Sequence, residues 1–188
     1  MKGKLYIALM HTPVYNKGGE VITTSITNLD VHDISRVVRT YGVRRYFMVH
    51  PQESQRQLVE KMISYWQHGF GGDYNPDRKE ALRLLELLSD INEVQQRITQ
   101  LEGQTAFTVV TDARVHSRSL SYQEMRQRIS RGDRPYLLLF GTGWGLIEDE
   151  IAKADFILHP IQADSDYNHL SVRSAVAIIL DRLMGNGW

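Results

Sequence analysis

Residues 134–151, RPYLLLFGTGWGLIEDEI, carry the pattern that decides the fold. The apolar run at 136–140 predicts a buried strand, the three glycines within 141–145 predict a turn, and a helix is expected to begin near Ile147. A turn with so little side-chain bulk lets a ligand touch the backbone itself. Such a turn holds a phosphate, a dinucleotide or another nucleotide-like molecule, or it is purely structural.

Two familiar phosphate-binding patterns do not match this turn. Gly143 and Gly145 are only two residues apart, so the order is not G-x-G-x-x-G, and no Gly-Lys-Ser/Thr follows as in a Walker loop. The helix then opens with Glu148, Asp149 and Glu150, which suit the helix dipole but repel a phosphate anion. The sequence therefore disfavours a dinucleotide-dependent oxidoreductase, while a structural turn and another nucleotide-like ligand stay open.

Strand and helix patterns alternate along the rest of the chain. Strands are expected at Leu5–Met10, 46–50, Phe107–Thr111 and 155–158, and helices at 31–41, 54–68, 78–89, 92–101, 121–130 and 170–184. Asp30 is the predicted N-cap of the first helix, and segment 69–77 is predicted as a loop. The alternation predicts one α/β domain over residues 1–188, with a mostly parallel sheet and helices on both faces.

The composition narrows the classes of function. The 22 Lys and Arg residues balance the 22 Asp and Glu residues, so RNA binding would need a local basic patch. The absence of cysteine excludes disulfides, zinc-thiolate sites and cysteine nucleophiles, and no metal site is expected. The N-terminal run reads as a strand and no apolar run is long enough to span a bilayer, so a cytoplasmic protein without membrane contact is expected.

Two polar segments are candidate sites, each with a simpler alternative. Segment 28–45 crowds Asp30, Asp33, Arg36 and Arg39 onto one short helix, either as a solvated face with ion pairs or as an arginine cluster for an anionic substrate. Segment 111–121 follows a strand and carries three basic residues, either as solvated surface or as a strip for an RNA backbone.

Together these pieces resemble the α/β-knot, or SPOUT, superfamily of S-adenosylmethionine-dependent RNA methyltransferases. LLLFGTGWGL fits the family's strand and glycine-rich loop, ADFILHPI fits its strand with an apolar-Pro-apolar end, and NHLSVRSAVAIIL fits its polar loop and alanine-rich helix. These matches cover residues 135–184. A weaker match, DVHDISRVVRTYGV, lies within 28–50 and places Arg36 on the family's arginine. Asp30 and Ser171 stand where the family usually or often has asparagine.

The resemblance implies a C-terminal trefoil knot over 135–184 and a cofactor, S-adenosylmethionine, held by the knot loops. Arg36, Asp30 and Ser171 are the implied catalytic residues, and Arg39, Arg114 and Arg118 the implied RNA-binding residues. The implied cofactor-binding residues are Thr111, Phe140, Gly141, Thr142, Gly143, Gly145, Leu158, His159, Pro160, Ile161, Asn168, His169, Leu170 and Ser171.

The same resemblance implies a substrate and an assembly. The substrate would be tRNA or rRNA, methylated on a ribose 2′-oxygen or a base nitrogen, and the closest likeness is to a small bacterial group of knotted tRNA and rRNA methyltransferases. A homodimer through the last helix is implied. Segment 54–101 either helps to select RNA or extends the core. The alternative is a non-catalytic RNA- or nucleotide-binding module that keeps the knotted fold.

Overall fold

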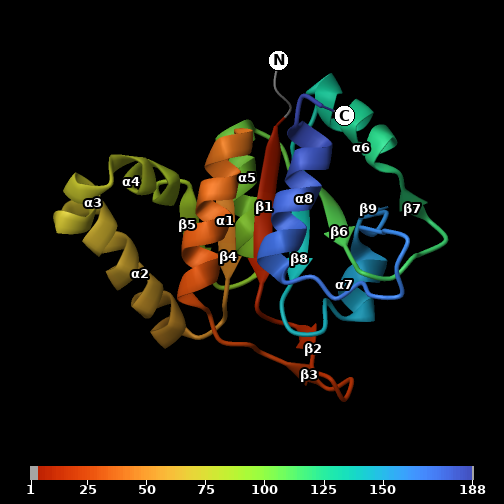
Figure 1. Ribbon diagram of the computed structural model, residues 1–188, viewed down its shortest axis with the longest axis horizontal. Coiled ribbons are helices and arrows are strands. Elements are labelled where there is room, and N and C mark those ends of the chain that lie inside the picture. The colour runs from red at the N-terminus through yellow and green to blue at the C-terminus, as the bar shows by residue number, and fades with distance from the viewer. Residues whose placement is uncertain (1–3, 188) are drawn as a thin grey trace.

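Residues 4–187 are described by a computed structural model, whose centre is a seven-stranded parallel sheet (Figure 1). Its strand order is β5-β4-β1-β8-β6-β9-β7. The strands are β1 (Leu5–Met10), β4 (Tyr46–Val49), β5 (Leu85–Leu88), β6 (Phe107–Thr111), β7 (Ser119–Leu120), β8 (Tyr136–Gly141) and β9 (Phe156–Leu158). Every pairing in this sheet is parallel, which confirms the predicted sheet type.

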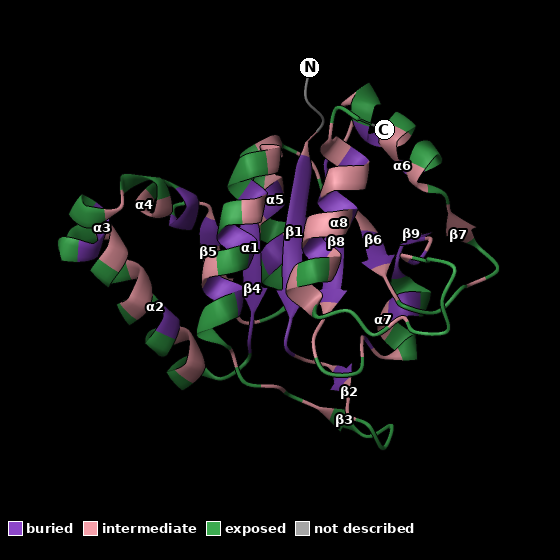
Figure 2. Cartoon of the chain, viewed as in Figure 1, coloured by how far each residue is buried: buried purple, intermediate pink, exposed green. Residues whose placement is uncertain are grey.

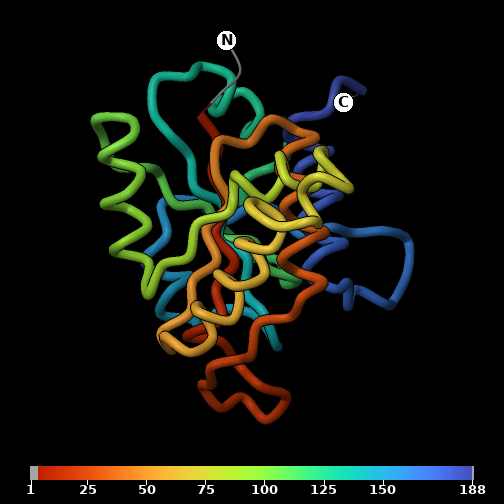
Figure 3. Tube along the Cα trace, turned by 90° about the vertical axis from the view of Figure 1, so that its left-hand side faces the viewer, coloured from red at the N-terminus to blue at the C-terminus, as the bar shows by residue number. Residues whose placement is uncertain are grey.

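Helices cover both faces of the sheet, as predicted. One face packs against α1 (Asn28–Tyr41), α2 (Glu53–His68), α6 (Tyr122–Arg131) and α8 (Val172–Met184). The other packs against α5 (Ile91–Glu102) and α7 (Glu148–Lys153), and Figure 3 shows α5 across the sheet from the first group. Because both faces are covered, the central strands are buried along their whole length (Figure 2) and read as continuous apolar runs.

The first helix begins earlier than predicted. Thr27, in extended conformation, is the N-cap, and its hydroxyl accepts a hydrogen bond from the backbone N–H of Asp30 at 3.2 Å. Asp30 as the cap was therefore wrong. The extra turn places Asp30 inside the first turn of the helix, where its side chain is buried instead of capping.

Segment 69–89 also differs from its prediction. It forms the short helices α3 (Phe70–Tyr74) and α4 (Pro76–Leu82) and then strand β5, in place of a loop and one helix. Asn75 caps α4 through its side chain, with Pro76 at the first helical position. Residues Leu85–Leu88 become a strand because they pair with β4, and this long-range pairing overrides the local helical pattern.

Helices α2, α3 and α4 form an arm at the β5 edge of the sheet, largely exposed or half-buried (Figures 1 and 2). At the opposite end of the fold from α6 and the end of α8, β2 (Val14–Tyr15) and β3 (Val21–Ile22) form a small antiparallel hairpin. Within residues 4–187, no helix combines the length and apolar character needed to cross a bilayer. The C-terminal knot stays a prediction, because strand order and register do not describe how the chain is threaded.

The packing of α1 on the sheet gives a matched stability test. Ile34 is fully buried in the core, whereas Leu29 on the same helix is exposed. Ile34→Ala is expected to lower the free energy of unfolding by about 2–5 kcal/mol, since it removes buried methyl groups and leaves a cavity. Leu29→Ala should change it by less than about 0.5 kcal/mol. Urea unfolding measures both, and equal losses would contradict the packing described.

Candidate functional site

A cavity of about 830 Å³ lies at the carboxyl ends of β6, β8 and β9. Parallel α/β sheets place their ligand sites at this edge. Five chain segments line it: 24–30, 111–114, 140–145, 158–161 and 168–179. The lining combines apolar and polar residues. It includes every residue predicted to bind the cofactor: Thr111, Phe140, Gly141, Thr142, Gly143, Gly145, Leu158, His159, Pro160, Ile161, Asn168, His169, Leu170 and Ser171.

The glycine turn is held in place by the β2–β3 hairpin. The backbone N–H of Trp144 donates to the Tyr15 carbonyl at 2.8 Å, and the N–H of Tyr15 donates to the Gly145 carbonyl at 2.9 Å. Gly143 has a left-handed φ of 59°, and a Cβ there would lie 2.8 Å from the Tyr15 carbonyl oxygen. Both the conformation and the close approach require glycine, so the turn presents backbone to the cavity.

Threonine hydroxyls join the turn to the segment before α1. The Thr24 hydroxyl hydrogen-bonds the Thr142 hydroxyl, and the Thr142 hydroxyl also donates to the Met10 carbonyl at 3.1 Å. Behind them, Nδ1 of His11 lies 3.0 Å from the Thr24 hydroxyl oxygen. Thr24 and Thr142 both line the cavity, so this half-buried network fixes two of its walls relative to β1.

His11 is a fully buried histidine, and its ring lies 5.5 Å from that of His50. Burial, together with the neighbouring His50, lowers the pKa of His11 to about 4. Its Nε2 has no hydrogen-bond partner among the residues that the structure describes. His11 is therefore neutral near pH 7, and protonation would place a charge in the interior.

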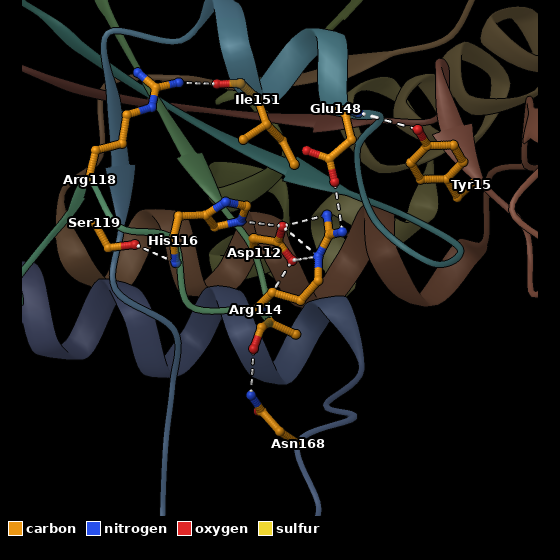
Figure 4. Close-up of polar contacts among 10 residues, drawn as sticks. Tyr15, Asp112, Arg114, His116, Arg118, Ser119, Glu148, Ile151 and Asn168 are labelled. Carbon is orange, nitrogen blue, oxygen red and sulfur yellow. Dashed lines mark hydrogen bonds and ion pairs between the residues drawn. The ribbon is translucent and has the colours of Figure 1, made fainter.

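Asp112, directly after β6, organises the opposite wall (Figure 4). Its carboxylate accepts from the Arg114 guanidinium at 2.8 Å and lies 2.9 Å from Nε2 of His116. Burial alone would raise the pKa of Asp112, but the hydrogen bonds from Arg114 and His116 outweigh it and hold the pKa below its usual value. Arg114 also donates to Glu148 at 2.7 Å, so this wall carries a fixed, ionised cluster.

Asp30 lines the cavity, but the arginine beside it is not the predicted one. Arg173, near the start of α8, donates to the Asp30 carboxylate at 2.8 Å and lies 3.7 Å from Asp33. The second Asp30 oxygen accepts from the Thr27 hydroxyl at 2.6 Å. Arg36 is exposed and lines a smaller hollow beside α4, so the structure does not bring it to the cavity of its own chain.

The other predicted polar residues have partners within the chain. Arg39 pairs with Glu80, and its guanidinium is about half exposed. Arg118 donates to the carbonyls of Ile151 and Ala154, where α7 ends (Figure 4). That contact is a structural role at a helix C-terminus. Ser171 caps α8 by accepting from the Ser174 backbone N–H at 3.3 Å.

Thr24, Asp112, Trp144 and Arg173 belong to this site and were not assigned to it from the sequence. Three of them had a detectable signal. Trp144 lies within the predicted glycine turn. Asp112 directly follows a predicted strand, and Arg173 lies inside the motif NHLSVRSAV. Thr24 had none, because its place at the cavity depends on a loop that returns from the hairpin to α1.

Comparison with known proteins assigns the chain to a family. The family model for SAM-dependent RNA methyltransferases matches residues 4–185. The chain belongs to this family. This match confirms the predicted resemblance at the level of the family. It also confirms the predicted methyltransferase activity and the cofactor S-adenosylmethionine, and it favours them over a non-catalytic module.

Two relatives of this methyltransferase differ in length. An uncharacterized protein of Aquifex aeolicus is 42% identical over 179 residues, which cover 95% of this chain and 87% of that protein. The tRNA (guanine-N(1)-)-methyltransferase of Oleidesulfovibrio alaskensis is 42% identical over 182 residues, which cover 97% of this chain and 42% of that protein. This chain therefore spans less than half of the second relative.

Solved structures share the fold of the methyltransferase at low identity. A methylase family protein of Haemophilus influenzae has a TM-score of 0.65 and 15% identity, over 98% of this chain and 66% of that one. A TrmH/SpoU tRNA modifying enzyme of A. aeolicus has a TM-score of 0.58 and 14% identity, over 98% of this chain and 75% of that one. These likenesses support the predicted α/β fold class.

The cavity fits the family's cofactor. Its apolar floor, from Phe140, Leu158 and Ile161, suits an adenine ring, and the glycine turn lets backbone groups approach a ligand closely. S-adenosylmethionine has a positive sulfonium and no phosphate. The carboxylates of Asp30 and Asp112 on the lining suit a positive group, and the acidic start of α7 repels no part of such a ligand's nucleoside.

The buried His11 predicts a loss of stability in acid. Its pKa is depressed in the folded state, so unfolding takes up a proton as the pH falls below about 6.5, and stability declines from there toward pH 4. Between pH 7 and pH 5, His11 is expected to lower the free energy of unfolding by about 2 kcal/mol. Urea unfolding should show this decline reduced by that amount in His11→Gln. An unchanged decline would contradict the assignment.

Proposed function

We propose that this chain methylates tRNA or rRNA, on a ribose 2′-oxygen or a base nitrogen, with S-adenosylmethionine bound in the cavity at the glycine turn. One observation carries the proposal: segments 140–145, 158–161 and 168–171, from separate parts of the sequence, converge on a single cavity. The name of the longer relative, a tRNA methyltransferase, supports tRNA as a substrate. RNA as substrate would place the protein in the cytoplasm.

The walls of the cavity would hold and orient the reactants. When bound, S-adenosylmethionine supplies an activated methyl group. The glycine turn and the apolar floor bind the nucleoside end, while Asp112 keeps segment 112–116 ordered against it. Orientation of this kind contributes much of the rate in a displacement reaction, because the nucleophile must be in line with the bond that breaks.

Arg173, held by Asp30, takes the place in the mechanism that the sequence motif gave to Arg36. Arg173 does not line the cavity itself but donates to Asp30, which does, and its side chain is about one-third exposed, so its guanidinium would keep donors for an RNA phosphate next to the target nucleotide. The buried Asp30 carboxylate accepts a hydrogen bond from Arg173 and so orients its guanidinium. The Thr27 hydroxyl donates to the same carboxylate and holds it in place. Ser171 lines the cavity, and the proposal retains the catalytic role predicted for it.

The same proposal includes a homodimer. The exposed or half-exposed residues of α8 include Ser174, Ala175 and Ala177, whose small side chains allow a second helix to approach closely. A two-fold axis near α8 would bring two cavities together. Arg36, on the exposed face of α1, would then contribute to catalysis only across such an interface.

Binding and transfer test the proposal directly. Calorimetry should show binding of S-adenosylmethionine and S-adenosylhomocysteine and none of NAD. Tritiated methyl groups should transfer to tRNA or rRNA from a strain that lacks the gene. Gly143→Ala is expected to weaken cofactor binding about tenfold or more, because of its positive φ and the clash with Tyr15. Gly103→Ala, also at positive φ but outside the cavity and without a clash, should leave it unchanged.

Matched lysine variants separate the two arginines. Arg173→Lys keeps the charge beside Asp30 but loses the planar fork, and transfer is expected to fall about 100-fold or more at saturating cofactor. Arg36→Lys should retain activity if each chain uses its own residues. Cofactor affinity, measured in parallel, should stay within about twofold in both. If Arg173→Lys keeps full methyl-transfer activity and Arg36→Lys loses it, the catalytic role belongs to Arg36, the arginine of the sequence motif.

A further inference from the structure

Aromatic side chains gather on one side of the cavity mouth and are exposed. Trp144 of the glycine turn is 57% exposed, and Tyr167 of the loop before α8 is 69% exposed. His169 lies between them, with its ring centroid 6.0 Å from that of Trp144 and 5.4 Å from that of Tyr167. A contiguous exposed patch of this kind, at the mouth of a cavity, is typical of an interaction site. We name Trp144, Tyr167 and His169 the aromatic rim.

The backbone under the rim is fixed. Trp144 is bonded through its N–H to Tyr15 and flanked by the glycines that the hairpin clamps. The loop that carries Tyr167 and His169 is tied to segment 111–114 by the Asn168 side chain, which donates to the Ala113 carbonyl at 2.9 Å (Figure 4). The rings are therefore presented outward with little backbone freedom to lose when a ligand binds.

The surrounding charges indicate which part of an RNA the rim would meet. Asp164 and Asp166 are exposed on the same loop as two of the rim rings, one to five residues before Tyr167 and His169 in the sequence. Carboxylates disfavour the phosphate backbone and accept hydrogen bonds from base amino groups. An aromatic ring offers a stacking face to any base. The rim thus suits an unpaired base, with the phosphates left to arginines elsewhere.

We propose that the aromatic rim is a stacking platform for an unpaired base of the RNA substrate, at or next to the nucleotide that receives the methyl group. This inference rests on the proposed function. Trp144 and His169 line the cavity while Tyr167 lies outside the lining, so the rim leads from solvent into the site. A base must leave its stack for its reactive atom to enter an enclosed site, and side-chain rings replace the lost stacking.

The test separates RNA binding from cofactor binding. Protein loaded with S-adenosylhomocysteine is titrated in filter binding with tRNA and rRNA fragments from a strain that lacks the gene. Trp144→Leu and Tyr167→Ala are each expected to weaken RNA binding about tenfold, which is within the range for loss of one stacked base. Trp144→Phe keeps a ring and should restore most of the affinity. Tyr74→Ala removes an equally exposed tyrosine from the distant helical arm and serves as control.

Calorimetry with S-adenosylhomocysteine completes the experiment. Unchanged cofactor affinity in Tyr167→Ala, whose ring lies outside the cavity lining, together with weakened RNA binding, is the expected result. If the Trp144→Leu/Tyr167→Ala double variant binds RNA as tightly as the wild type, the proposed role of the aromatic rim is wrong. Methyl transfer by the wild-type protein would still support the proposed function in that case. A parallel fall in cofactor affinity would also overturn the role of the rim, since the rings would then belong to the cofactor site. Cofactor binding by the wild-type protein without any RNA binding would overturn both.

Discussion

The pairing of β1 with β8 is the contact on which the site depends. It joins residues about 130 positions apart and runs the whole length of both strands, ending with Met10 beside Gly141. Both strands therefore stop at the same level. The segments that follow them, the hairpin and the glycine turn, meet there and exchange backbone hydrogen bonds through Tyr15. Without that register, the turn would have no fixed wall and the cavity no shape.

Glycine at 143 follows from this constraint and not from a ligand signature. A side chain there would collide with the Tyr15 carbonyl, whatever is bound in the cavity. The same clamp turns Trp144 outward, so one contact shapes the inner wall and also presents a ring to solvent. This also explains why the turn has no distinctive side chains that would identify a ligand. Its contacts with a ligand would come from backbone groups, which any close-packed glycine turn exposes.

The charged residues near the cavity are held in place by ion pairs within the chain. With no net charge overall, the chain relies on ion pairs that hold each group at one place: Asp112 with Arg114, and Asp30 with Arg173. Asp30 is buried and Asp112 is half-buried, and carboxylates in such places need partners because an unpaired charge away from water is unfavourable. These pairs hold the carboxylates of Asp30 and Asp112 in place on the cavity lining, where they suit the positive centre of a ligand, while the apolar residues of the lining suit its base.

The sequence by itself determined the alternation of strands and helices, the glycine turn and the lining segments at 111–114, 140–145, 158–161 and 168–171. The strands and helices follow from the local periodicity of apolar residues. The lining segments follow from three short motifs that occur in the same order as in the family that the sequence resembles. Two secondary-structure assignments were wrong. The pattern of Leu85–Leu88 predicts a helix, but these residues form a strand by pairing with β4, and Asp30 was predicted as an N-cap but lies in the first turn of α1, because Thr27 is the cap. The catalytic role of Arg36, which matches a motif but lies outside the cavity of its own chain, stays a prediction.

Only the tertiary structure decided which polar groups meet. Arg173 reaches Asp30 across 143 residues, and Thr24 reaches Thr142 across 118, because helix packing and the β1–β8 register bring these segments together. Sequence patterns specify which face of an element is apolar. The partners of its polar side chains depend on how those faces pack, and that is fixed only when the whole core forms.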